Sequence, residues 1–151
     1  MQSTVATGEI SESVSEGDSG INGTETGTGF KVMVIDDSKT IRRTAETLLK
    51  KEGFDVVIAT DGFEALGLIA DHKPDLILLD IMMPRLDGYQ TCALIKNHRI
   101  FRHTPVVMLS SKDGLFDRAR GRVVGSDNYI TKPFTREELL TVIEQYSNRT
   151  E

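Results

Sequence analysis

Short apolar runs alternate with amphipathic stretches along most of the chain. A short unbroken apolar run is typical of a strand that is covered on both faces, whereas apolar residues that recur every three or four positions are typical of a helix. The apolar runs predict strands at 31–35, 54–59, 76–80, 106–110 and 129–131. The amphipathic stretches predict helices at 38–52, 61–72, 88–97 and 114–124, and a last helix that begins after Thr135.

Several of these helices carry signals that support them or weaken them. The helix at 38–52 is followed by Gly53, and glycine is common just after the last turn of a helix. Thr135 and Glu138 have the spacing of a capping box at the start of the last helix. The helix at 114–124 is weaker, because Gly121 costs about 1 kcal/mol relative to alanine in a helix interior.

The order of the predicted elements indicates the fold class. Strands that alternate with helices of this length predict right-handed crossovers, and therefore a parallel sheet between two layers of helices. The sequence thus predicts a doubly wound α/β fold built from five strand-then-helix units. The carboxyl ends of all strands in such a sheet lie at one edge, where open α/β sheets bind their ligands.

Charge divides the chain into two parts. Residues 1–29 contain five acidic residues, no Lys or Arg, and many Gly, Ser and Thr residues. Such a segment cannot bury enough apolar surface to offset the entropy of ordering, so it predicts a disordered acidic N-terminal tail. The other 18 acidic residues (23 minus 5) balance the 18 basic ones. The expected domain spans 30–147, with a short C-terminal tail at 148–151.

Composition excludes several classes of protein. The balanced domain lacks the dense basic stripe of a nucleic-acid-binding protein, so no nucleic-acid partner is expected. No apolar stretch is long enough to cross a membrane, and the N-terminus does not resemble a secretory signal, so no membrane insertion is expected. The single cysteine, Cys92, cannot form an internal disulfide, which fits a reducing compartment. We expect a cytoplasmic protein with no output domain after the last helix.

Polar side chains stand where the predicted strands end. Asp36 and Asp37 follow the first strand, Asp80 ends the third, Ser110 ends the fourth and Lys132 follows the fifth. Because the carboxyl ends of parallel strands share one edge, we expect these side chains to converge on one crevice. For the first pair alone, capping of the following helix would be an equally good explanation. Agreement among four strands makes coincidence a poor explanation.

The chemistry of this crevice favours phosphoryl transfer. Three carboxylates repel one another, by up to about 4 kcal/mol per pair at 4 Å with an effective dielectric near 20. Mg²⁺ would offset this repulsion, since it takes a few carboxylate oxygens and leaves positions for phosphate, whereas the three histidines have no metal-ligand spacing. We therefore predict that Asp80 accepts a phosphoryl group, that Lys132 neutralises its oxygens and that Ser110 donates a hydrogen bond to it.

Four motifs built on these residues resemble those of response-regulator receiver domains, the CheY-like family of two-component signalling. They are Val-Ile-Asp36-Asp37-Ser, Leu-Asp80-Ile-Met-Met-Pro84-Arg-Leu-Asp87-Gly88, Met-Leu-Ser110-Ser and Tyr129-Ile-Thr-Lys132-Pro133-Phe134. The resemblance covers residues 31–146 and implies a flavodoxin-like sheet with the strand order 2-1-3-4-5. It also implies a cis peptide bond between Lys132 and Pro133.

The resemblance implies a role for each site residue. Asp80 is the phosphoacceptor, Lys132 binds the phosphoryl group, Ser110 is the switch hydroxyl and Tyr129 is the switch aromatic residue. Mg²⁺ is held by three carboxylates and one backbone carbonyl, those of Asp36, Asp37, Asp80 and Met82.

The resemblance also implies two kinds of protein partner in a phosphorelay. A histidine kinase or a histidine phosphotransfer domain would dock on the helix at 38–52, with Ile41 and Arg42 as contacts. A downstream protein effector would bind the face made by the fourth helix, the fifth strand and the fifth helix, where we expect Arg118, Arg120 and Arg122. More narrowly, several stretches resemble single-domain regulators of type IV pilus twitching motility.

Other functions stay open at this point. A flagellar chemotaxis-type regulator would share these motifs. A Mg²⁺-dependent phosphotransfer enzyme is disfavoured, because the adjacent Asp36 and Asp37 differ from the Asp-x-Asp of haloacid-dehalogenase-type phosphatases. A flavodoxin-like electron carrier is disfavoured by the absence of tryptophan and of a Ser/Thr/Gly-rich phosphate loop. A scaffold that is never phosphorylated is disfavoured by the complete acidic set. The prediction is a phosphorylation-dependent binding switch, not an enzyme.

Overall fold

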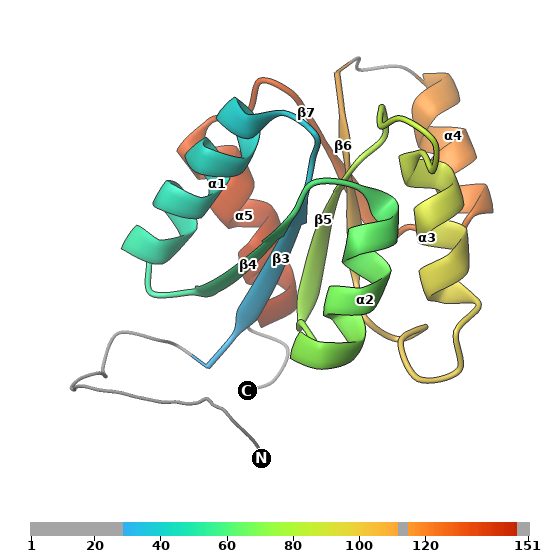
Figure 1. Cartoon of the computed structure of the whole chain (residues 1–151). Helices are drawn as coiled ribbons and strands as arrows, with labels where there is room; N and C mark the ends of the chain where they lie inside the picture. Colours follow the sequence, from blue (N-terminus) through green and yellow to red (C-terminus); the bar gives the residue numbers. More distant parts are fainter. Residues whose placement is uncertain (1–28, 112–114, 148–151) are drawn as a thin grey trace.

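The computed structural model describes residues 29–111 and 115–147, including all their side chains except those of residues 115 and 116. The predicted tails, apart from residue 29, lie outside the described residues. In the described part of the chain, five strands alternate with five helices (Figure 1).

All five strands belong to one parallel sheet. They are β3 (Lys31–Ile35), β4 (Asp55–Ala59), β5 (Leu76–Asp80), β6 (Val106–Ser110) and β7 (Asn128–Thr131). Their order across the sheet is β4-β3-β5-β6-β7, and every neighbouring pair is parallel. This is the predicted order 2-1-3-4-5, which is therefore confirmed.

Helices cover both faces of the sheet (Figure 1). They are α1 (Lys39–Lys51), α2 (Gly62–His72), α3 (Gly88–Lys96), α4 (Leu115–Val123) and α5 (Arg136–Ser147). The helices α1 and α5 lie on one face, and α2, α3 and α4 lie on the other. Each predicted strand and helix is present, and the described bounds differ from the predicted ones by a residue or two at most.

The core consists of two apolar clusters, one on each side of the sheet. Alternate residues of β3 point to opposite faces, so Met33 and Ile35 pack with residues of α2 and α3. Val32 and Val34 instead pack with residues of α1 and α5. Because both faces of the central strands are covered, those strands are continuous apolar runs rather than alternating ones.

The signals at the helix ends work as the sequence predicts. The backbone of Gly53 has a φ of 91°, which residues other than glycine rarely adopt, and it lies two residues after α1 ends. At the start of α5 the Glu138 amide donates to the Thr135 hydroxyl, and the Thr135 amide donates to the Glu138 carboxylate. The Lys132–Pro133 peptide bond is cis, as the resemblance implies.

The topology fixes the place of the crevice. From the interior strand β3 the chain proceeds to β4 on one side, and it later returns to β5 on the other side. The connections that follow β3 and β5 therefore leave the sheet over opposite faces, and a crevice opens between them at the carboxyl edge. No described helix is both long enough and apolar enough to pass through a lipid bilayer.

Candidate functional site

Three carboxylates meet at the crevice between β3 and β5. Ile35 pairs with Leu79 in the sheet, so Asp36 and Asp80 are the next residues on two adjacent strands. One carboxylate oxygen from each of Asp36, Asp37 and Asp80 lies within 4.8 Å of the others. Asp36 and Asp80 are buried, whereas Asp37 is exposed. The acidic residues from two strands thus form one cluster that opens to solvent on the side of Asp37.

The turn between β3 and α1 holds Asp36 in place. The Ser38 amide donates to the Asp36 carboxylate at 2.8 Å, while the Ser38 hydroxyl caps α1 by accepting from the Ile41 amide. The guanidinium of Arg42 donates to the backbone carbonyl of Asp36 at 2.7 Å. Arg42, which we predicted as a partner contact, is therefore half-buried and is also part of the support of the acidic cluster.

Lys132 reaches the cluster from the far side of β6. It follows β7, which is two strands away from β5, but its long side chain spans that distance. Its ammonium group donates to Asp36 at 3.1 Å and to Asp80 at 3.0 Å. Burial is the largest single influence and opposes the charged ammonium, yet the hydrogen bond to Asp80 and the two negative charges together raise the pKa of Lys132.

Asp80 is the carboxyl group most affected by its surroundings. It is only 2% exposed, and burial, helped by the charge of Asp36, raises its pKa to about 6 against the opposing hydrogen bond from Lys132. Its Oδ1 also accepts from the Met82 amide at 3.3 Å. Within the described part of the chain, both hydrogen bonds to the Asp80 side chain thus end on Oδ1.

The loop after β5 brings the chain back against Asp80. A Cβ at Gly88 would overlap the backbone carbonyl oxygen of Asp80 and the Cα of Ile81, so only glycine fits there. Gly88 is the first residue of α3, whose start is fixed by a complete capping box between Asp87 and Gln90. The loop also exposes Met82, whose side chain is 70% accessible.

The donor set suits a hard divalent cation. Carboxylate oxygens are the ligands that Mg²⁺ prefers, and the three here are close enough to share one ion. None of the three histidines is near the cluster, and each is exposed at a helix end or in a loop. Cys92 offers no soft ligand either, because burial raises its pKa to about 11. The residues therefore fit magnesium rather than zinc or copper.

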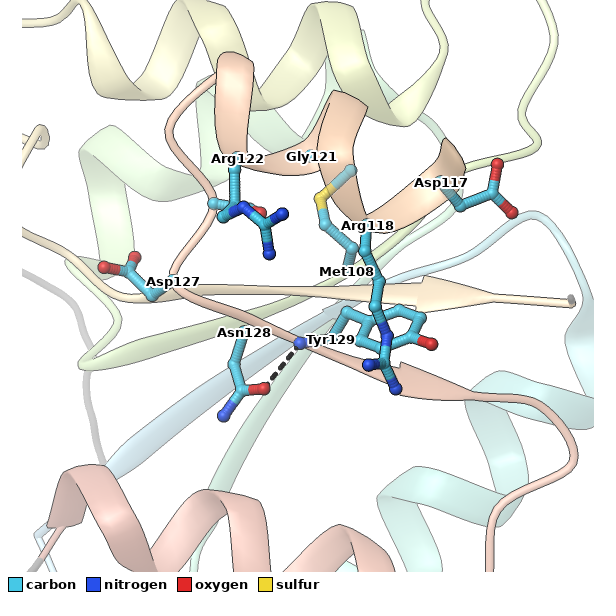
Figure 2. A pocket seen from close by; sticks show the side chains of 9 residues that line it. Met108, Asp117, Arg118, Gly121, Arg122, Asp127, Asn128 and Tyr129 are labelled. Carbon is cyan, nitrogen blue, oxygen red and sulfur yellow. Dashed lines mark hydrogen bonds between the residues drawn. The ribbon is translucent and has the colours of Figure 1, made fainter. Parts of the chain in front are cut away.

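The Ser110 and Tyr129 side chains both contact α4. The buried Ser110 hydroxyl donates to the carboxylate of Asp117 in α4 at 3.0 Å. The Tyr129 ring is half-buried under α4, and the guanidinium of Arg118 stacks on it at 4.3 Å from the ring centre (Figure 2). Ser110 and Tyr129 thus contact two consecutive residues of α4, Asp117 and Arg118.

The arginines of α4 do not all share one face. Arg118 and Arg122 line a cavity of about 300 Å³ between α4 and β7, together with Tyr129 (Figure 2). Arg120 instead stacks on the ring of Tyr89 in α3, at 4.3 Å from the ring centre. The expectation that Arg120 joins the face of α4, β7 and α5 is therefore wrong, because residues two positions apart on a helix point to different sides.

Asp117 and Tyr89 contact each other beside Ser110, although the sequence offers no reason to expect either residue there. The Tyr89 hydroxyl donates to Asp117 at 3.2 Å, so Asp117 receives hydrogen bonds from two elements. Both residues look like ordinary helix positions, and the contact depends on how α4 is placed after the loop that follows β6. No pattern in the sequence could have indicated it.

The chain is similar to known proteins over nearly all of the described domain. A family model for the response regulator receiver domain matches residues 32–144. Protein PilG of Pseudomonas aeruginosa is 72% identical over 118 residues, which are 78% of this chain and 87% of that protein.

Two solved structures resemble the fold closely. The chemotaxis protein CheY4 of Vibrio cholerae is 30% identical with a TM-score of 0.75, covering 78% of this chain and 98% of that one. The receiver domain of the sensor histidine kinase PA1611 from Pseudomonas aeruginosa is 26% identical with a TM-score of 0.74, covering 80% of this chain and 99% of that one. That structure is described as having a magnesium ion coordinated in its active-site cleft.

Proposed function

Since the chain belongs to the response regulator receiver domain family, we propose that it is a signalling switch that accepts a phosphoryl group on Asp80. The observation that carries this proposal is the bridge made by Lys132, whose ammonium contacts both Asp36 and Asp80. A cation held between two carboxylates at a strand end is arranged to receive the negative charge of a phosphoryl group.

Asp80 acts as the nucleophile in this proposal. One carboxylate oxygen forms a bond to phosphorus, the bond from phosphorus to the donor atom breaks, and the donor atom keeps the electron pair. Both hydrogen bonds to the described Asp80 side chain end on Oδ1, which favours Oδ2 as the attacking oxygen. Lys132 is already within reach of the group that forms, so its charge needs little rearrangement.

Mg²⁺ is the proposed cofactor, held by the carboxylates of Asp36, Asp37 and Asp80 and by the backbone carbonyl of Met82. When bound, it would neutralise the charge on the phosphoryl oxygens during transfer. The spacing of the three carboxylates supports this assignment, and so does the description of the PA1611 receiver domain with magnesium.

Ser110 and Tyr129 are the proposed link from phosphorylation to output. Ser110 would turn its hydroxyl toward the phosphoryl group, and Tyr129 would move further under α4. A groove beside Tyr129 runs over α4, β7 and α5, and its lining includes Arg118 and Glu138. Such a mixed charged surface suits a downstream protein effector, with Arg118 and Arg122 among its contacts.

A histidine kinase or histidine phosphotransfer domain is the proposed source of the phosphoryl group. Its docking face would be the start of α1, with Ile41 and Arg42 as contacts. These residues lie within one turn of the cap at Ser38, next to the exposed carboxylate of Asp37. Such a partner could therefore reach the crevice from its open side.

The proposed pathway is control of type IV pilus twitching motility from the cytoplasm. The 72% identity to PilG and the narrower resemblance of the motifs support it. The similarity to CheY4 supports flagellar chemotaxis as the second candidate. Expression of this protein in two bacterial strains separates the two pathways. In a strain that lacks PilG we expect twitching to recover, and in a strain that lacks its flagellar chemotaxis regulator we expect no recovery of swimming.

Intact-protein mass spectrometry tests the phosphoacceptor. After incubation with phosphoramidate and Mg²⁺, we expect the wild type to gain one labile phosphoryl group and Asp80→Asn to gain none. Asp75→Asn is the matched control, since Asp75 precedes β5 and faces Lys31 at the other end of the sheet. Equal labelling of wild type and Asp80→Asn would reject Asp80 as the acceptor.

A further inference from the structure

Asp117 joins three elements around the Ser110 side chain. One of its carboxylate oxygens accepts from the Ser110 hydroxyl of β6 at 3.0 Å, and the other accepts from the Tyr89 hydroxyl of α3 at 3.2 Å. Burial, with the nearby Asp117 charge, raises the pKa of Tyr89, which keeps the phenol protonated as a donor. Asp117 itself lies on α4 and is half-buried.

The neighbouring residue of α4 holds the second group at this place. Figure 2 shows Arg118 over the Tyr129 ring, with Asp117 pointing away from both. Consecutive residues of α4 thus contact the two groups that the proposed function makes the switch, one by a hydrogen bond and one by stacking. The cavity of about 300 Å³ between α4 and β7 is lined by both Asp117 and Arg118, as well as by Tyr129.

The Ser110 hydroxyl has one proton and can serve one strong acceptor at a time. In this structure it serves Asp117, although Ser110 lies at the end of β6, directly beside the strand that carries Asp80. A phosphoryl oxygen on Asp80 would compete with Asp117 for the same proton. A hydrogen bond to a charged acceptor is strong enough to change an equilibrium about tenfold or more.

We propose that Asp117 is a positioning residue that holds Ser110 in the unphosphorylated arrangement and so opposes switching. This inference rests on the proposed function, because it takes Ser110 as the ligand of the phosphoryl group. Breaking the contact of Asp117 with Ser110 is part of the free energy that phosphorylation must supply. The strength of that contact sets how much of the protein stays in the resting state.

Affinity for beryllofluoride, a mimic of the phosphoryl group, tests the proposal in the full chain with Mg²⁺. We expect Asp117→Ala to bind the mimic about tenfold more tightly than the wild type, and Asp117→Asn to fall between them, since its amide oxygen is a weaker acceptor. Tyr89→Phe is the matched control, because it removes the other hydrogen bond to Asp117 and leaves the one from Ser110. We expect it to change the affinity less than twofold.

A double-mutant cycle separates positioning from a general loosening of α4. In the Ser110→Ala background, Asp117→Ala should leave the affinity for beryllofluoride unchanged, because no hydroxyl remains to be held. An equal gain in both backgrounds, or no gain in either, would overturn the proposal. If Asp117→Ala fails to fold, Asp117→Asn gives the same test with a smaller expected gain.

Two further measurements distinguish a failure of the positioning role from a failure of the proposed function. Without metal or mimic, the backbone amide resonances of Ser110 and Tyr129 should shift in Asp117→Ala toward their positions in the mimic-bound wild type. Asp80→Asn should not bind the mimic. If the wild type fails to bind, or Asp80→Asn binds equally, the proposed function is wrong. If those two results hold and Asp117→Ala has no effect, only the positioning role is wrong.

Discussion

The helices α4 and α5 follow one another along the chain, yet their described side chains contact the rest of the protein in different ways. Four residues of α5 are buried in the core: Leu139, Leu140, Ile143 and Tyr146. Among the described side chains of α4, all large ones are exposed or half-buried, and Val123 is 84% accessible. Its attachments include the bonds of Asp117, the stacking of Arg118 on Tyr129 and that of Arg120 on Tyr89.

This difference suits the two helices to different tasks. If α5 moved, its buried side chains would be exposed to water, and no other contact would replace the stabilisation that is lost. The helix α5 therefore has one favourable position. Hydrogen bonds and stacked cations can be exchanged for other partners at small net cost. Under the proposed function, the described contacts of α4 are therefore ones that a competing acceptor or a partner protein could replace, whereas those of α5 are not.

Leu139→Ala in α5 is expected to reduce the stability of the protein more than any other change considered below. Leu139 is fully buried, so the change removes apolar contacts and leaves a cavity, and the free energy of unfolding should fall by about 2–5 kcal/mol. Val123→Ala on α4 is the control and should change it by less than about 0.5 kcal/mol. Urea unfolding followed by circular dichroism measures both, and similar losses for the two variants would remove the distinction between the helices.

Asp80→Asn tests the stability of the acidic crevice, which is separate from the attachment of the two helices. In metal-free protein at pH 7.5 the variant should be more stable than wild type by about 1–3 kcal/mol, because a buried charge whose pKa is raised to about 6 is removed. The native state binds this proton more tightly than the unfolded chain, so the stability of the wild type falls as pH rises from 3.8 to about 6.

The advantage of Asp80→Asn should therefore be greatest above pH 6 and should fade as the pH falls toward 4. Thermal unfolding in a chelator at a series of pH values measures it. The exposed residue Asp71 supplies the control, since Asp71→Asn should have little effect at any of these pH values. A variant that is no more stable than wild type at pH 7.5 would mean that Lys132 already compensates for the buried charge.

Thr135→Ala should have an intermediate effect on α5. It removes the hydroxyl that accepts from the Glu138 amide, and loss of such a cap costs about 1 kcal/mol. Thr135→Ser keeps the acceptor and should be close to wild type. If Thr135→Ala proved harmless in urea unfolding, core burial alone would fix α5.

Arg118→Ala should have the smallest effect on stability. An exposed stacked cation contributes about 0.5–1 kcal/mol, so the free energy of unfolding should fall by no more than that. The change should appear locally instead, as faster hydrogen exchange of α4 amides with unchanged exchange in α5. Arg122→Ala is the matched control, and faster exchange in both helices would contradict separate attachment.

Much of the molecule could be predicted from the sequence because its signals are local. The continuous apolar runs such as Leu76 to Leu79 predicted buried strands, and Thr135 with Glu138 predicted the start of α5. The convergence of Asp36, Asp80 and Lys132 followed from topology, since strand ends in a parallel sheet share one edge.

The contacts around α4 could not be predicted in the same way. The position of α4 depends on a loop, and its partners come from β6, β7 and α3, so no short sequence spacing describes them. Arg120 was assigned to the wrong face for this reason. Asp117 is an ordinary acidic residue until the fold places it against Ser110.

The ammonium of Lys132 between two buried carboxylates has one more consequence. It is a counterion that the chain supplies itself, so the acidic crevice is already partly neutralised in protein that has just been synthesised. Folding then has no need to wait for a metal. With Mg²⁺ in its proposed role, a cell that runs short of divalent ions would keep this protein folded while its phosphorylation declined.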